Sequence, residues 1–161
     1  MATNDIFAGL YVSVYLSDKT GNTSIAGTDF QEITEVSAFP EIGIERQVID
    51  VPNFSTPTNR KLVGRSSIND VSLSVNYVPG DIVHEKLIAL ADTGTKAQFK
   101  IIYWTDESKE YGLATVYNGF ISSANMSGGS DAVVAQNFNI AIDKRVITGI
   151  VDTSSISTDF R

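Results

Sequence analysis

The stretch from residue 71 to residue 77 constrains the fold most, because its side chains alternate strictly between apolar and polar. The apolar positions are Val71, Leu73, Val75 and Tyr77, and the polar ones are Ser72, Ser74 and Asn76. A period of two is typical of a half-buried β-strand. The chain is therefore predicted to be mainly β. Further strand patterns occur at residues 10–16, 30–36, 97–104, 111–123 and 133–146.

One segment breaks this pattern and predicts a short α-helix at about residues 81–92. A Pro-Gly pair ends the preceding strand, Asp81 is placed as an N-cap, and Gly94 follows as a stop. An apolar stripe is expected to pack the helix on the sheet. It comprises Ile82, Val83, Leu87, Leu90 and Ala91. The predicted architecture is an antiparallel β-sandwich or small barrel with this helix packed on it.

The length of 161 residues predicts one domain, residues 1–150, followed by a C-terminal tail, residues 151–161. Within the domain, residues 37–67 are the least regular segment and hold three of the four prolines. Such a segment is usually functional or mobile, and here it predicts a long arm that becomes ordered against a neighbour. Residues 42–51 are compatible with a strand, but the sequence does not identify its partner.

The charge is acidic and unevenly distributed. The chain has 19 acidic and 12 basic residues, a net charge of −7. This argues against a protein that grips nucleic acid by neutralising phosphates, but not against one that touches DNA without holding it. A basic cluster of Arg60, Lys61 and Arg65 interrupts the acidic sequence. It is either a solvated loop or a contact to an acidic surface on another copy.

The residues that usually carry chemistry are few. The chain has no cysteine, which excludes disulfides, thiolate nucleophiles and cysteine metal ligands. His84 is the only histidine and has no second histidine or suitably placed carboxylate as a partner, so it is expected to be an exposed helix residue. The acidic residues lie mainly in turns, and no phosphate-binding glycine motif is present. No catalytic, cofactor or metal site is predicted.

Export and membrane insertion are not expected from the sequence. No basic segment precedes the first apolar run, as a secretory signal requires. No apolar run approaches the roughly 20 residues of a membrane-spanning helix. The sequence therefore predicts a soluble protein, and the absence of cysteine is compatible with the cytoplasm.

A regularly spaced polar surface has two interpretations. Ser72, Ser74 and Asn76 are small and uncharged, and so are Asn137 and Asn139 on another predicted strand. Composition alone favours an ordinary solvent-facing side of a sandwich. The alternative is a smooth wall that faces water or a passing polymer with little cationic charge to hold it.

Two segments show a characteristic order of features. The first, VNYVPGDIVHEKLIALADTGTKAQFKIIYW, reads as strand, Pro-Gly, short helix, Thr-Gly-Thr turn and strand. The second, VYNGFISSANMSGGSDAVVAQNFNIAIDKRV, carries an Asn-Gly-Phe-Ile-Ser-Ser segment ahead of a last long strand. In this order they resemble the major tail tube proteins of long, non-contractile-tailed phages of the lambda-like type. The resemblance covers about residues 69–146. Residues 1–68 match only in general character.

The resemblance implies a structural, non-enzymatic subunit that assembles with itself. Six copies would form a ring whose strands join into one barrel around a lumen, and rings would stack into a tube that conducts double-stranded DNA at infection. The arm residues Arg60, Lys61 and Arg65 would then contact the next ring, and the Ser and Asn positions would be the candidate lumen face. The helix would lie outside, near the joints between subunits. An acidic or neutral lumen would repel phosphate, which suits a net charge of −7.

Further partners follow from the same resemblance. They are a tape measure protein in the lumen before DNA, a tail terminator, and distal tail or baseplate proteins, in a virion tail assembled in the host bacterial cytoplasm. Contractile-tail and type VI secretion tubes share the fold and remain an alternative. A β-sandwich that binds carbohydrate or belongs to a cell surface is an alternative of another class, and it predicts a monomer with exposed aromatic side chains.

Overall fold

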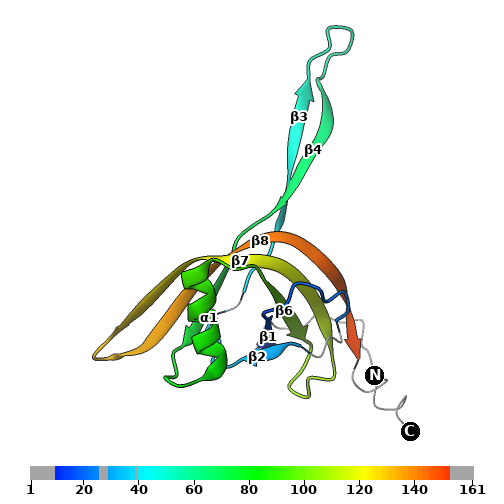
Figure 1. Cartoon of the computed structure of the whole chain (residues 1–161). Helices are drawn as coiled ribbons and strands as arrows, with labels where there is room; N and C mark the ends of the chain where they lie inside the picture. Colours follow the sequence, from blue (N-terminus) through cyan, green and yellow to red (C-terminus); the bar gives the residue numbers. More distant parts are fainter. Residues whose placement is uncertain (1–9, 26–28, 39, 153–161) are drawn as a thin grey trace.

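The computed structural model describes residues 10–25, 29–38 and 40–152. Within these ranges the chain forms eight strands and one helix (Figure 1). The strands are β1 Val12–Ser17, β2 Gln31–Ile33, β3 Ile44–Val51, β4 Arg60–Ile68, β5 Val71–Asn76, β6 Ala97–Trp104, β7 Tyr111–Gly129 and β8 Ala132–Asp152. The helix is α1, Ile82–Thr93. The prediction of a mainly β chain with one short helix is confirmed.

Six of the strands form one antiparallel sheet in the order β2-β1-β6-β7-β8-β5. The sheet curls until its two edges meet, because the chain that leaves β2 pairs with β5 at the opposite edge. Val36 forms a bridge with Val75, and the Ser37 N–H donates to the Ser74 carbonyl oxygen at 2.8 Å. The sequence predicts either a β-sandwich or a small barrel, and the structure is a curled sheet that is nearly closed to a barrel.

The core fills the concave side of this sheet. Val71, Leu73 and Val75 point inward, as the alternation predicts, and each is at most 1% exposed. Their neighbours from the other strands join them in one buried cluster. That cluster comprises Val14, Leu16, Ile33, Ala97, Phe99, Ile101, Ile121, Phe138 and Ile140, together with Leu87 of α1. Alternation along each strand therefore places one face in the core.

Strand β6 is buried on both faces, which the sequence does not reveal. Its second face is covered by part of the segment between β1 and β2. The Gln98 amide donates to the Thr20 carbonyl oxygen at 3.2 Å, and the Lys100 ammonium donates to the Ile25 carbonyl oxygen at 3.1 Å. The same ammonium lies 4.5 Å from the centre of the Tyr15 ring, a cation–π distance. Burial lowers the pKa of Lys100.

The helix has the capping residues that its sequence predicts. The Asp81 carboxylate accepts hydrogen bonds from the backbone N–H groups of Val83 at 2.9 Å and His84 at 3.2 Å. The bond from His84 is the main reason why the pKa of Asp81 is lowered. Gly94 ends the helix in the left-handed conformation, with φ at 67°, which glycine adopts without strain.

The predicted apolar stripe of the helix is correct except at Ile82. Leu87 is fully buried, and Val83, Leu90 and Ala91 pack against the core, whereas Ile82 is 71% exposed. Successive helix residues are about 100° apart, so a residue five positions before Leu87 points about 140° away from it. Ile82 therefore faces outward, and Ile88 contributes to the packing in its place.

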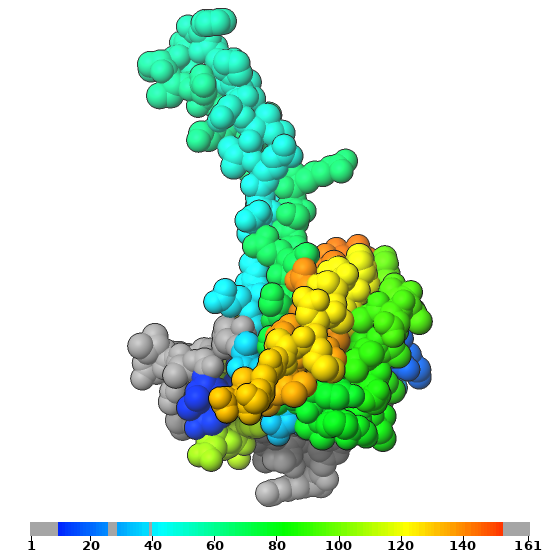
Figure 2. All heavy atoms as spheres, turned by 90° about the vertical axis from the view of Figure 1, so that its left-hand side faces the viewer, coloured from blue at the N-terminus to red at the C-terminus, as the bar shows by residue number. Residues whose placement is uncertain are grey.

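Strands β3 and β4 form a separate hairpin, here called the arm, which projects from the body (Figure 1). The space-filling view shows the arm standing clear of the body (Figure 2). The unidentified partner of residues 42–51 is therefore the segment that carries the basic cluster. The pairing is antiparallel and contains one irregularity between Arg46 and Val48. Where the sequence suggests little regular structure, the chain forms an ordered two-stranded ribbon.

Candidate assembly surfaces

Both faces of the arm carry exposed apolar side chains. Val48 pairs with Val63 across the ribbon, and Ile49 pairs with Leu62. Successive residues of a strand point to opposite faces, so these two pairs lie on opposite sides. All four side chains are at least 45% exposed. A two-stranded ribbon is only marginally stable in water without a covering layer, and the described residues cover neither face of this one.

The three predicted basic residues lie on β4 in different settings. Arg60 lies next to the tip and is paired with Val51, and Lys61 is paired with Asp50. Arg65 lies at the irregularity in the middle of the ribbon. The charge of Lys61 is thus partly balanced within the arm, because an acidic residue sits directly across from it. Arg60 and Arg65 have no acidic residue directly across the ribbon in this register.

The predicted polar residues come together on the outer face of the sheet. Ser72 pairs with Asn139, and Ser74 pairs with Asn137, whose amide oxygen accepts a hydrogen bond from the Ser74 hydroxyl at 2.8 Å. Asn76 lies at the next outward position of β5. None of these side chains is charged, and all are exposed or half-buried.

Strand β7 extends this polar surface with residues that the sequence reading missed. Ser123 pairs with Asn139, and Asn125 pairs with Asn137. The surface formed by Ser72, Ser74, Asn76, Ser123, Asn125, Asn137 and Asn139 is called the Ser/Asn face below. The alternation of side chains continues past residue 123. The Gly128-Gly129 pair suggests a turn, however, so the sequence analysis places the end of the strand too early. The strand in fact runs to Gly129.

The long β7–β8 ribbon leaves two strand edges open. Strand β6 pairs with β7 only as far as Gly119, so residues 120–129 pair with β8 alone. On the other side, β5 pairs with β8 only as far as Ile140, so residues 141–152 pair with β7 alone. In the described part of the chain no further strand is paired with either stretch. Long open edges are templates for pairing with another chain.

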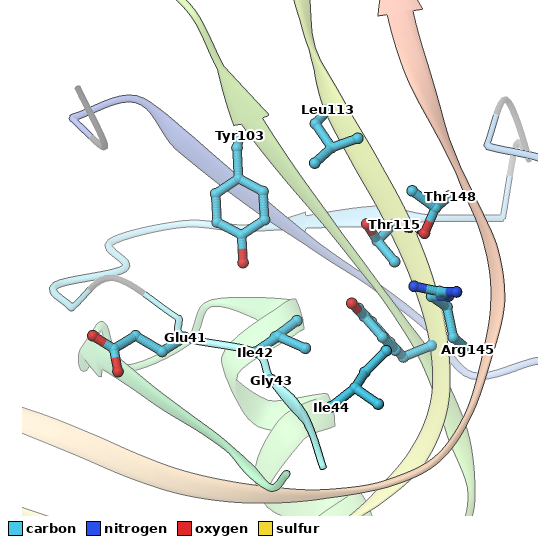
Figure 3. A pocket seen from close by; sticks show the side chains of 10 residues that line it. Glu41, Ile42, Gly43, Ile44, Tyr103, Leu113, Thr115, Arg145 and Thr148 are labelled. Atoms are coloured by element: carbon cyan, nitrogen blue, oxygen red, sulfur yellow. Dashed lines mark hydrogen bonds between the residues drawn. The ribbon is translucent and has the colours of Figure 1, made fainter. Parts of the chain in front are cut away.

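A cleft of about 660 Å³ lies between the root of the arm and the sheet (Figure 3). Its walls are Glu41, Ile42, Gly43 and Ile44 on one side and Tyr103, Leu113, Thr115, Tyr117, Arg145 and Thr148 on the other. The Tyr103 hydroxyl donates to the Pro40 carbonyl oxygen at 2.8 Å and so ties the arm root to β6. Burial raises the pKa of Tyr103 to about 12, which keeps this hydroxyl protonated as a donor.

His84 is buried, so the prediction of an exposed histidine is wrong. Its side chain is 1% exposed. The Val78 N–H donates to Nδ1 at 3.3 Å, and Nε2 lies 2.9 Å from the Thr34 carbonyl oxygen. Nε2 therefore carries the hydrogen, and both ring nitrogens bind the backbone. The cause is again the angular position around the helix axis, because a residue three positions before Leu87 points only about 60° away from it.

The described residues contain neither a metal-binding cluster nor a membrane-spanning helix. No group of three or more histidine, cysteine, aspartate or glutamate side chains is arranged to hold a metal ion there. No helix in the described ranges is long and apolar enough to cross a membrane. What the described surface offers is an arm, two open strand edges, the Ser/Asn face and a cleft.

Comparison with known proteins agrees with a role in assembly. Residues 14–147 match the family model described as lambda phage tail tube protein. No curated protein sequence matches the chain.

Solved structures share the fold at low sequence identity. The SPP1 tail tube is 13% identical, with a TM-score of 0.62 over 91% of this chain and 80% of that one. The tail of an empty gene transfer agent particle is 14% identical, with a TM-score of 0.62 over 86% and 93%. The sheath/tube terminator of the PVC extracellular contractile injection system is 16% identical, with a TM-score of 0.66 over 92% and 99%.

The family match spans most of the chain, including the curled sheet, the helix and the arm. The chain therefore belongs to the lambda phage tail tube protein family and is a structural subunit of a tail tube in a virion.

Proposed function

We propose that copies of this chain join side by side through the two open strand edges and close into a ring. The observation that carries the proposal is the unpaired edge of β7 at residues 120–129, opposite the unpaired edge of β8 at residues 141–152. Pairing one edge with the other in the next copy continues the sheet from subunit to subunit. A closed ring then leaves no edge exposed.

Six copies per ring are proposed by analogy with the related assemblies. The gene transfer agent tail is described with C6 symmetry, and the anti-feeding prophage baseplate, whose chain has a TM-score of 0.61 with this one, is six-fold symmetrised. The arm then connects one ring to the next. Its two exposed apolar faces support insertion between neighbouring subunits, because packing there covers both sides of the ribbon.

The Ser/Asn face is proposed to line the lumen. It carries small uncharged side chains, and Asp70 at its rim accepts a hydrogen bond from Asn139 at 3.5 Å. Such a wall offers double-stranded DNA no cation to bind, so DNA passes without being held. A tape measure protein fills the lumen first, and terminator and distal tail proteins close the two ends. Assembly takes place in the bacterial cytoplasm, and the subunit performs no enzymatic reaction.

Electron microscopy of the purified protein tests the proposal. Rings and stacked tubes with a central channel are expected at high protein concentration. A protein that remains monomeric at every salt concentration and crowding condition would contradict it. Because the PVC sheath–tube complex shares the fold with a TM-score of 0.63, a sheath protein bound to the purified tube would instead assign the chain to a contractile system.

A lysine on the Ser/Asn face is expected to slow DNA delivery without preventing assembly. Ser72→Lys places one ammonium group per subunit in the proposed channel, where each ring adds attraction for phosphate. We expect the DNA ejection rate of particles that carry this variant to fall roughly ten-fold or more. Ser108→Lys, in the exposed turn between β6 and β7, is the matched control. Equal ejection rates for the two variants would show that this face does not line the channel.

A further inference from the structure

We propose that Phe54, at the tip of the arm, inserts into the cleft at the arm root of a second copy of this chain. This inference rests on the proposed stacking of rings and identifies the receiving site and the anchoring side chain. The occupant is thus a described segment of an identical subunit, and the contact joins one ring to the next.

The tip presents a single aromatic side chain among mainly polar neighbours. Phe54 is fully exposed, and its neighbours in residues 52–59 are serine, threonine, asparagine and proline. The Asn53 side-chain oxygen accepts a hydrogen bond from the Ser55 N–H at 3.0 Å, and the Thr56 hydroxyl donates to the Thr58 carbonyl oxygen at 2.8 Å. These bonds fix the turn around Phe54 before any contact forms. An aromatic side chain on a preorganised turn with polar neighbours is suited to act as an interface hot spot.

The cleft has the complementary surface. Leu113, which is 38% exposed, and the half-exposed Ile44 supply apolar walls (Figure 3), and Tyr117 also lines the cleft. The exposed Thr148 adds a hydroxyl group suited to the polar residues beside Phe54, and it donates a hydrogen bond to the buried Thr115 hydroxyl at 3.4 Å. The volume of about 660 Å³ admits the aromatic ring together with part of the tip backbone.

The cleft and the outer end of the arm each carry charges of both signs. Glu41 and Arg145 line the cleft, and both are exposed. The outer end of the arm carries Arg60 next to the tip and the Asp50–Lys61 pair one step below it. An arm that enters the cleft therefore brings a cation for Glu41 and an anion for Arg145. Such complementarity fixes orientation and excludes wrong registers more than it adds affinity.

The arm cannot fill the cleft of its own subunit. Ile44 lines the cleft and is also the first residue of the arm, so the tip is separated from its own cleft by the length of β3. Eight strand residues span about 26 Å. The contact is therefore made between copies, and it joins two different surfaces. A contact of this kind that does not close on itself generates an open stack, which is the geometry of a tube.

Disulfide trapping tests the contact directly, because the chain has no cysteine of its own. An untagged chain with Phe54→Cys is mixed with a longer, tagged chain with Leu113→Cys, assembled and oxidised. A disulfide between the two chains is expected as a mixed-size band that reducing agent removes. The matched control pairs Phe54→Cys with Ile82→Cys, which is 71% exposed on α1 outside the cleft. We expect at least ten-fold less product there.

The outcomes separate this inference from the proposed function. If the wild-type protein forms no rings or tubes, the proposed function fails. If tubes form but Phe54→Cys reacts with position 113 no better than with position 82, the tip occupies another surface and the inference is overturned. Should the cysteine variants fail to assemble, a cryo-EM map of the wild-type tube decides, since it shows whether the Phe54 ring lies against Leu113 or elsewhere.

Substitution of Phe54 supplies a quantitative readout. With Phe54→Ala, the protein concentration needed for tube growth is expected to rise at least roughly thirty-fold, the loss expected for an aromatic hot spot. Phe54→Leu keeps an apolar anchor and is expected to shift this concentration less than five-fold, about the size of a modest core replacement. Similar critical concentrations for the alanine variant and the wild type would overturn the anchor role.

Discussion

Deleting the arm is expected to abolish tubes while leaving a folded subunit that still forms rings. A two-residue Asn-Gly turn in place of residues 45–67 joins Ile44 to Ile68, which are already cross-strand partners. The Asn69 N–H donates to the Gly43 carbonyl oxygen at 2.9 Å directly below them, so the base of the hairpin is kept. No removed residue belongs to a core cluster. The free energy of unfolding should therefore change by no more than about 1 kcal/mol.

Electron microscopy and thermal unfolding are the measurements. Rings without stacking, together with an unchanged unfolding transition, are expected for the deletion. A milder control reverses only Arg60 and Arg65 to glutamate and keeps Lys61, whose reversal would set two acids opposite each other at Asp50. This variant should stack poorly rather than not at all. Full-length tubes from the arm-deleted protein would refute a role of the arm in stacking.

Gly119→Ala is expected to destabilise the subunit by about 3 kcal/mol or more, because a Cβ at this position has no room. It would overlap the carbonyl oxygen of Ala141 and lie 3.3 Å from the Cα of Ile142, both main-chain atoms of the paired strand. A backbone oxygen cannot rotate away as a side chain can. The substitution therefore forces β7 and β8 apart where the pairing is already irregular, between Asn118 and Gly119.

Thermal unfolding followed by circular dichroism measures this effect, with a fall in melting temperature of roughly 10 °C expected. Gly129→Ala in the β7–β8 ribbon is the control, since no atom lies within 4 Å of its added Cβ. If both variants melt like the wild type, the close approach at Gly119 is not a constraint. The result bears on the Asn-Gly-Phe-Ile-Ser-Ser segment, whose glycine serves strand packing.

Much of the fold follows from the sequence where one face of an element is buried. The alternation in β5 places Val71, Leu73 and Val75 in the core, and the caps at Asp81 and Gly94 set the helix ends. The errors at Ile82 and His84 arise from reading the apolar pattern without the rotation of each residue around the helix. Counting that rotation from Leu87 corrects both.

Other features depend on contacts that sequence periodicity does not record. The arm carries apolar residues on both faces and contains an irregularity. Its sequence therefore shows neither the two-residue period of a half-buried strand nor the period of an amphipathic helix. Strand β6 is covered on its second face by a segment distant in the sequence, so its local pattern predicts a strand but not that both faces are buried. The cleft joins the arm root to β6, β7 and β8. No local sequence pattern predicts that these segments come together, because their distance depends on how far the sheet curls.

The bridge between Val36 and Val75 has a mechanical consequence. The chain that contains Val36 runs on into β3, and β4 runs directly into β5, which contains Val75. Both strands of the arm are thus connected to the body at the same end of the short Val36–Val75 pairing, which closes the sheet. We expect tension along the arm to draw the two sides of that closure in the same direction, without a peeling load on the hydrogen bond between Ser37 and Ser74. A tail that is bent or stretched can then transmit force from subunit to subunit while each sheet remains closed.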